Sequence, residues 1–161
     1  MKVLNCLHGD EDAATNMVFT NPVDARAPYV AIGNFVYRCC PDPEVEPGHV
    51  AMNAFQRRSC RVFPGDDVDV QDYLIPMRDF ELKAVTIEAE WLRNPGNMPR
   101  PDLSELASLF RTKFSGHVLT RNQVICMRYI DTWIYFQVKS NVRGLLTLQT
   151  EVGVEWNWSF V

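Results

Sequence analysis

Two patterns of hydrophobic and polar positions follow one another along the chain. Up to residue 70, apolar residues come in short runs between turn signals, and residues 29–32 and 35–39, for example, flank the pair Gly33-Asn34. Two β-prone runs around such a pair predict a hairpin. Residues 67–70 alternate polar and apolar side chains, which is typical of a strand with one buried face. This first part therefore predicts many short strands, almost no helix, and a small closed or partly closed β-barrel.

The pattern changes after a connector at residues 72–78. Residues 80–92 alternate for much of their length and predict one long strand, which ends at a proline-rich loop, 94–101. Asp102 and Glu105 then have the spacing of a helix N-cap and its acidic partner. A run of apolar residues at helical spacing follows, and Gly116 marks the stop. The residues of this face are Leu103, Leu106, Ala107, Phe110 and Phe114.

Strand patterns return after this one main helix. Residues 123–129 and 132–139 predict a hairpin around Ile130-Asp131, and residues 118–120, 145–148 and 152–161 predict further strands. The second part is therefore expected to be an α+β unit in which strands pack on one helix. The whole chain is predicted to be α+β, mainly β, with a boundary at Pro76 that separates residues 1–76 from residues 77–161.

The last predicted strand continues to Val161 without a polar tail. A natural C-terminus usually frays through polar residues. The sequence therefore favours the hypothesis that the chain is an N-terminal piece of a longer protein.

Composition limits the class of protein. The chain has 161 residues, 47% of them hydrophobic and 22% charged, which is enough apolar material for one ordinary domain or two small ones. The net charge of −4 argues against a general nucleic-acid binder, because such proteins are usually basic. Five cysteines without CxxC spacing favour a reducing, intracellular compartment. Since no apolar run could span a bilayer and no signal peptide is present, we expect a cytoplasmic protein without direct membrane insertion.

Catalytic motifs are absent from the sequence. It contains no GxxxxGK[ST], GxSxG or HExxH pattern, so we predict no P-loop, no corresponding hydrolase chemistry and no cofactor for this chain. The histidines His8, His49 and His117 are scattered and are expected to be turn or surface residues rather than metal ligands. Cys60 lies beside arginines that could lower its pKa and make it reactive. A small buried hydrophobe in a strand is the favoured interpretation of this cysteine.

A cluster of positive charge lies in the acidic first part, between two segments predicted to be extended, 49–53 and 61–63. Residues 1–76 hold six Lys or Arg against eleven Asp or Glu, and three of the six lie within five positions, at Arg57, Arg58 and Arg61. Arginines clustered at a turn can pair with the carboxylates of an acidic partner. They can equally form surface ion pairs within the barrel, which contribute little to stability. The candidate internal partners are Asp66, Asp67 and Asp69.

The order of these motifs resembles the N-terminal domain of the N-ethylmaleimide-sensitive factor (NSF) family, the AAA+ ATPases that disassemble SNARE complexes. The matching stretches are PGHVAMNAFQRRSCRVFPGDDVDV, VTIEAEWL, and DLSELASLFRTKF running on to WIYFQVKS. With residues 15–19 and 29–32, the resemblance spans nearly the whole chain. The order and spacing of the stretches carry it, since no single one is diagnostic.

The resemblance implies a double-psi β-barrel subdomain over residues 1–76, an α/β roll subdomain over residues 77–161, and a groove between them. It also implies a non-catalytic domain that docks the adaptor SNAP, whose acidic surface meets basic residues, and through it SNARE complexes. ATP, Mg²⁺ and hexamer formation would belong to ATPase domains outside this chain. The protein would work in the cytoplasm, at the periphery of vesicle and target membranes.

The resemblance also carries over candidate residues for SNAP binding. Arg57 and Arg58 match the family's basic pair after Gln56. The second basic cluster of the family departs here, because Arg93 is followed by Asn94 and Pro95 and only Arg100, in the loop beyond, could compensate. A third basic position, just before the first cysteine, is Asn5, with Lys2 nearby. The partner-binding candidates are therefore Lys2, Arg57, Arg58, Arg93 and Arg100.

Two other functions stay open at this point. A valosin-type AAA+ ATPase has an N domain of the same architecture, which recruits ubiquitin-linked cofactors through a more hydrophobic groove. Double-psi barrels also occur in decarboxylases and proteases, but the sequence lacks a self-processing Gly-Ser step and an Asp in an Asp-Thr/Ser-Gly setting. Fold alone does not decide between these functions.

Overall fold

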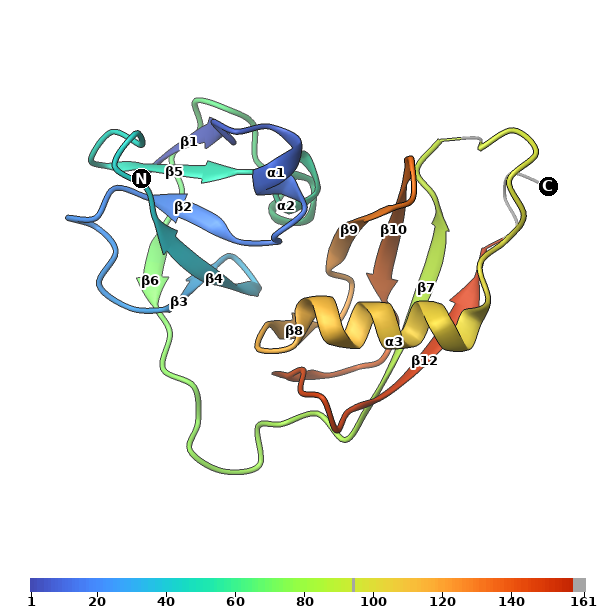
Figure 1. The fold of residues 1–161 in the computed structure, drawn as a ribbon. Helices are drawn as coiled ribbons and strands as arrows, with labels where there is room; N and C mark the ends of the chain where they lie inside the picture. The colour runs from blue at the N-terminus through green and yellow to red at the C-terminus, as the bar shows by residue number, and fades with distance from the viewer. Residues whose placement is uncertain (94, 158–161) are drawn as a thin grey trace. The chain divides into compact units, whose positions relative to one another are not determined.

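The computed structural model describes residues 1–93 and 95–157 and divides the chain into two compact units, Met1–Asp79 and Phe80–Val161 (Figure 1). The first unit is built on one six-stranded mixed sheet, in the order β1-β5-β2-β4-β3-β6. Its strands are β1 (Lys2–Asn5), β2 (Val18–Thr20), β3 (Tyr29–Ile32), β4 (Phe35–Pro41), β5 (His49–Met52) and β6 (Val70–Asp72).

One stretch of chain contacts both edges of this sheet. The backbone of Val3, in β1, exchanges hydrogen bonds with Gly65 and Asp66, each 2.8 Å long. A few residues later the same stretch becomes β6, which pairs with β3 at the other edge. The sheet is therefore curled, with an apolar interior that includes Val3, Val18, Ile32, Tyr37, Val50 and Met52.

The predicted hairpin in this unit is confirmed. Strands β3 and β4 pair in antiparallel fashion, with Ile32 opposite Phe35, and Gly33 at the turn has a φ of 58°. Glycine suits this position because a left-handed backbone conformation disfavours a Cβ atom. The strand predicted over residues 67–70 is largely wrong, since only Val70 belongs to β6 and Asp67 forms an isolated bridge with Lys2.

The prediction of almost no helix in this part is also wrong. A short helix, α1 (Asp10–Ala13), follows β1, and a second, α2 (Ala54–Cys60), follows β5. Helix α2 lacks the apolar periodicity that marks most helices, because its one fully buried side chain is the polar Gln56. The segment 61–63, predicted to be extended, forms the end of this helix and the loop after it.

The second unit contains a four-stranded sheet in the order β12-β7-β10-β9, a two-stranded sheet of β11 and β8, and one helix, α3 (Leu103–Phe114). Helix α3 lies along one face of the larger sheet (Figure 1). Its buried residues Leu106, Phe110 and Phe114 share one core with Ile87 of β7 and Phe136 of β10. The strands are β7 (Ala84–Trp91), β8 (Val118–Thr120), β9 (Val124–Tyr129), β10 (Thr132–Val138), β11 (Arg143–Leu145) and β12 (Glu151–Trp156).

The main sequence predictions for this unit are confirmed. Asp102 caps α3, since its Oδ1 accepts a 2.9 Å hydrogen bond from the Glu105 backbone N–H. Strands β9 and β10 form the predicted hairpin, with Thr132 opposite Tyr129. The alternating segment at 80–92 is a strand from Ala84 onward. The chain as a whole is mainly β with few helices, as predicted.

Three local predictions need correction. The strand predicted at 145–148 is wrong, because β11 ends at Leu145 and the side chain of Thr150 accepts a 3.0 Å bond from the Thr147 N–H within a turn. His117 is buried rather than at the surface, with its ring edge-on to Phe114 at 5.7 Å. The final strand ends at Trp156, and the predicted continuation over 158–161 lies outside the described residues.

The structure was also searched for helices that could span a membrane. Of the helices formed by the described residues, none combines the length and the apolar character needed to cross a bilayer.

Candidate functional site

Helix α2 begins with a reciprocal capping box. Asn53 Oδ1 accepts a 2.8 Å hydrogen bond from the Gln56 backbone N–H, and Gln56 Oε1 accepts one of 2.9 Å from the Asn53 N–H. Gln56 is completely buried, and its Nε2 also donates to the carbonyl of Met17 at 3.0 Å. Gln56 therefore fixes the start of the helix to the segment that leads into β2. Of the helix residues after it, Arg58 is exposed, whereas Arg57, Ser59 and Cys60 are half-buried.

The helix ends at an arginine in a left-handed conformation. Arg61 has φ 58° and ψ 46°, a position that glycine usually occupies. The backbone N–H groups of Arg61 and Val62 close the last turn by donating to the carbonyls of Arg58 and Arg57, at 3.3 and 3.0 Å. A charged side chain is thereby placed at the point where the chain leaves the helix.

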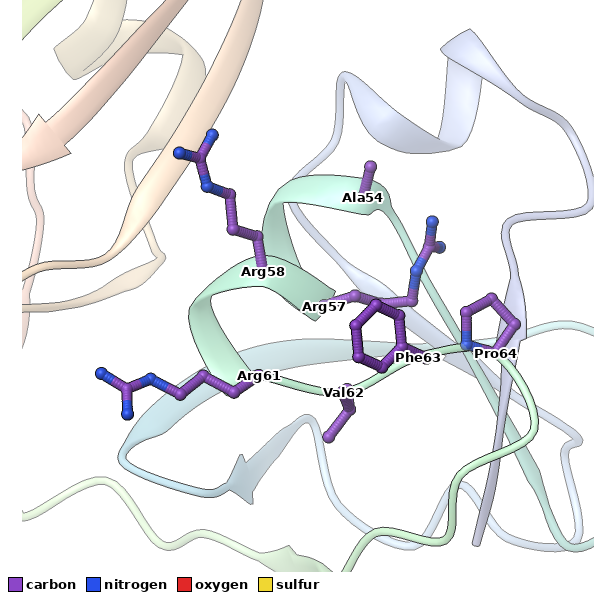
Figure 2. A pocket seen from close by; sticks show the side chains of 7 residues that line it. All are labelled: Ala54, Arg57, Arg58, Arg61, Val62, Phe63 and Pro64. Carbon is purple, nitrogen blue, oxygen red and sulfur yellow. The ribbon is translucent and has the colours of Figure 1, made fainter.

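A hollow of about 430 Å³ opens beside this helix end (Figure 2). Figure 2 shows the Arg58 and Arg61 side chains reaching out on one side and that of Arg57 pointing the opposite way, with the Phe63 ring between Arg61 and Pro64. The lining is part apolar and part cationic, and consists of Ala54, Arg57, Arg58, Arg61, Val62, Phe63 and Pro64.

The three arginines of this hollow are not equivalent. Arg57 is half-buried, and its Nη1 donates a 2.6 Å hydrogen bond to the carbonyl of Met52 at the end of β5. Arg58 and Arg61 are exposed, and their side chains make no hydrogen bond or ion pair with any residue that the structure describes. Arg57 therefore supports the fold, whereas Arg58 and Arg61 present their charge to solvent.

The interpretation of the cluster as internal ion pairs is wrong. Among residues 1–93 and 95–157, no salt bridge joins an arginine of the cluster to Asp66, Asp67 or Asp69. Asp66 instead accepts a 2.8 Å hydrogen bond from the Phe63 N–H, and Asp69 one of 2.6 Å from the Gln71 side chain. The positive charge of the cluster is therefore not neutralised by contact with these carboxylates.

The cysteines near the site are poorly suited to nucleophilic chemistry. Cys60 is the last residue of α2, not part of a strand as predicted, and its Sγ lies 3.6 Å from the carbonyl of Ile32. Burial raises the pKa of the Cys60 thiol. Burial, and then the nearby Asp12 carboxylate, raise the pKa of Cys6 to about 11. Both thiols are thus held in the protonated, unreactive form at neutral pH.

The predicted binding residues divide between the units. Arg57 and Arg58 meet at the hollow, whereas Lys2 lies on β1, exposed but not part of the lining. Arg93 and Arg100 are exposed residues of the second unit, in the loop between β7 and α3. The set of predicted binding residues does not include Phe63. The signal for it was present, because a Pro-Gly turn follows Phe63 directly and prevents a strand from burying the ring.

A second polar cluster joins residues far apart in the sequence. His8 Nε2 lies 3.5 Å from Asp42 Oδ2 and 3.2 Å from Glu44 Oε2. His8 is an exposed turn residue, as predicted. The three side chains are close enough to hold a metal ion, but an ordinary polar contact at the surface explains the geometry equally well. Sequence spacing could not reveal this cluster, since the loops that carry it meet only in the fold.

No model of a known protein family matches the chain. Individual proteins do. The chain is 30% identical over 112 residues, 69% of its length, to a vesicle-fusing ATPase of Arabidopsis thaliana. It is 28% identical over 152 residues, 89% of its length, to the vesicular-fusion protein SEC18 of Candida albicans.

The chain is related to the vesicle-fusing ATPases. Its recognition as an N-domain-like piece of an NSF-type protein is thereby confirmed. The matched regions make up only 15% and 19% of the two relatives, so most of each relative lies beyond the similarity.

Proposed function

We propose that this chain is a non-catalytic docking domain of a vesicle-fusion ATPase, and that it binds the SNAP adaptor on SNARE complexes. Its two vesicle-fusion relatives support the general setting. In this proposal ATP, Mg²⁺ and hexamer formation belong to ATPase domains outside the chain, and the protein acts in the cytoplasm at the periphery of membranes.

One observation carries the docking proposal: Arg58 and Arg61 hold exposed guanidinium groups, without a partner in the described structure, at the end of a fixed helix. Guanidinium groups pair with carboxylates through two parallel hydrogen bonds. Clustered positive charge also raises association rates with an acidic partner, by an amount that falls with salt. An acidic adaptor surface fits both properties.

The finer assignments belong to the same proposal. The curled sheet of the first unit would be a double-psi β-barrel over residues 1–76, and residues 77–161 would form an α/β roll. Lys2, Arg93 and Arg100 would contribute further cations to SNAP binding, in addition to Arg57 and Arg58. Exposure of Lys2, Arg93 and Arg100 is consistent with this role.

The test is a titration of the chain with a SNAP–SNARE complex at low and high salt, using an Arg58→Glu variant. Arg58 is chosen over Arg57 because the Arg57 side chain also bonds the Met52 carbonyl. We expect salt-sensitive binding by the wild-type chain and a loss of at least about tenfold in affinity for Arg58→Glu, since a like charge replaces an attractive one.

Arg26→Glu is the matched control, because Arg26 is an exposed arginine of the same unit outside the hollow. If Arg58→Glu and Arg26→Glu weakened binding equally, the loss of affinity would reflect the change in net charge and not a specific contact of Arg58. Unchanged binding by Arg58→Glu would move the docking site elsewhere. Binding to ubiquitin-linked cofactors, and none to SNAP, would instead favour a valosin-type function.

A further inference from the structure

Phe63 is an exposed aromatic residue at the edge of the hollow. Its side chain is 76% exposed, although a buried phenyl ring would contribute far more to stability. It stands next to Val62 and Pro64, which also line the hollow. Large exposed apolar side chains that cluster on a surface commonly mark interaction sites.

The loop that carries Phe63 is fixed by hydrogen bonds. The Phe63 N–H donates to Asp66 Oδ2 at 2.8 Å, and the Phe63 carbonyl accepts from the Asp66 N–H at 3.1 Å. On the other side, the Val62 N–H donates to the carbonyl of Arg57 at 3.0 Å. An aromatic group held in this way loses little conformational entropy when it binds a partner.

Two cations line the same hollow as the ring, and Figure 2 shows both reaching out on one side. Arg58 and Arg61 line the hollow together with Phe63, and within the described structure their guanidinium groups have no hydrogen-bond or ion-pair partner. An apolar centre with a charged rim is the usual composition of a protein-binding patch.

The surroundings favour a short acidic segment over a continuous polyanion. Asp66, Asp67 and Asp69 are all exposed within a few residues of the hollow. A membrane surface or a nucleic-acid backbone would bring its negative charge against these carboxylates as well as against the arginines. A discrete pair of carboxylates on a peptide segment can contact Arg58 and Arg61 alone.

We propose that Phe63 is the apolar anchor of a docking surface formed by Arg58, Arg61, Val62, Phe63 and Pro64. Its occupant is an acidic protein segment that places one apolar side chain on the Phe63 ring and carboxylates on the two arginines. The inference rests on the proposed function, because that segment would belong to the adaptor. Binding then has a component that salt does not weaken, in addition to the component from charge pairing.

The first experiment measures the affinity of the SNAP–SNARE complex for the wild-type, Phe63→Ser and Arg58→Gln chains over a range of salt concentrations. Phe63→Ser is expected to weaken binding by about tenfold or more, the effect of exposing a buried aromatic contact, with an unchanged salt dependence. Arg58→Gln is expected to weaken binding mainly at low salt and to flatten the salt dependence. Leu74→Ser is the matched control, since Leu74 is 86% exposed in the same unit and lies outside the hollow.

The second experiment does not depend on the adaptor. Two short acidic peptides are compared by amide chemical-shift titration, one with a central leucine between glutamates and one with serine in its place. The wild-type chain is expected to bind the leucine peptide more tightly and to shift the amide signals around Phe63. Phe63→Ser is expected to bind both peptides equally, and the dispersion of its amide signals tests whether the variant is folded.

The outcomes separate the two proposals. Wild-type-like adaptor binding by Phe63→Ser, together with loss in Arg58→Gln, would overturn the role of Phe63 and leave the docking function intact. Absence of adaptor binding by the wild-type chain would overturn the docking function, and the peptide comparison would then decide the surface chemistry. Equal affinity of the wild-type chain for both peptides would overturn the inference in either case.

Discussion

Helices α2 and α3 both start with a polar side chain that accepts a hydrogen bond from the backbone N–H three residues on, at 2.8 Å for Asn53 and 2.9 Å for Asp102. Beyond the cap they differ in what they bury. Helix α3 buries four apolar residues in the core of its unit, whereas α2 buries only Gln56, a polar residue. Helix α2 also leads directly into the docking surface, because Arg58 and Arg61 lie at its end.

The difference shows how a short helix can present a binding surface. A helix held by an apolar face must devote much of its circumference to the core. Helix α2 is held by two directional contacts at one residue, because Gln56 bonds both the Asn53 N–H and the Met17 carbonyl. Arg58 in the helix and Arg61 at its end are then available for a partner. We expect the two helices to respond to mutation in ways that reflect these two kinds of anchoring.

The largest effect is expected for Phe110→Ala in α3. Phe110 is fully buried, and its ring lies 5.1 Å from that of Phe114 and 4.9 Å from that of Phe136. Removing it should lower the free energy of unfolding by about 3–5 kcal/mol through lost burial and an unfilled cavity. Urea unfolding followed by tryptophan fluorescence reports this unit, since Trp91, Trp133 and Trp156 lie in it and residues 1–79 contain no tryptophan.

Leu109→Ala is the control for that measurement. Leu109 is the neighbouring residue on the same helix and is 40% exposed, so its substitution removes far less buried area. We expect a change below about 1 kcal/mol. Similar losses for the two variants would mean that α3 is not held by its apolar face.

A smaller loss is expected for Gln56→Ala in α2. The substitution removes the bonds to the Asn53 N–H and the Met17 carbonyl and leaves both groups in a buried environment. The expected cost is about 1–3 kcal/mol for a lost cap and unsatisfied polar groups. Amide signals of Val3 and Val50, in the core of the first unit, would report the shifted urea midpoint.

Gln149→Ala provides the matched amide deletion at an exposed position. It is expected to leave the midpoint unchanged. If Gln56→Ala also left the urea midpoint unchanged, the hydrogen bonds of Gln56 would not contribute to stability. The contrast between the two helices would then be wrong.

The same contrast explains what the sequence could and could not predict. Helix α3 was predictable because Leu106, Phe110 and Phe114 recur at helical spacing, and the hairpins because turn residues separate β-prone runs. Helix α2 was missed because periodicity is the wrong signal for a helix whose buried side chain is Gln56. The spacing of Asn53 and Gln56, which is that of a capping box, was the signal in the sequence that could have predicted the start of α2.

The candidate site follows the same division. Charge alone identified Arg57 and Arg58, but their different roles depend on the Met52 carbonyl, which only the fold brings to Arg57. The cluster of His8, Asp42 and Glu44 depends on loops distant in sequence. The Pro-Gly turn after Phe63 indicated that its ring is exposed, whereas the hydrogen bonds with Asp66 that fix its loop are seen only in the fold.

Arg57→Ala and Arg58→Ala should separate these two roles within α2. Losing the 2.6 Å bond to the Met52 carbonyl should lower stability by about 1 kcal/mol for Arg57→Ala. Arg58→Ala should change stability by less than about 0.5 kcal/mol, as is usual at exposed positions without contacts. Thermal unfolding of both variants measures the difference, and equal stabilities would remove the distinction between the two arginines.

The smallest effect on stability is expected for Arg61→Gly, at the end of α2. Helix α3 is followed by Gly116 with a φ of 89°, whereas α2 ends with Arg61 at a φ of 58°. Glycine should relieve about 1 kcal/mol of left-handed strain at residue 61, but it gives up about 0.4–1 kcal/mol through the freer unfolded chain. The net change in thermal stability should therefore lie between zero and a slight gain.

Binding should change in the opposite direction, because Arg61→Gly removes one guanidinium group from the docking surface. We expect weaker binding of the SNAP–SNARE complex at low salt and a flatter salt dependence. Arg61→Lys is the control that keeps the charge and the left-handed strain, and it should retain most of the affinity. A marked loss of stability in Arg61→Gly, or unchanged binding, would mean that this arginine serves the end of the helix rather than the partner.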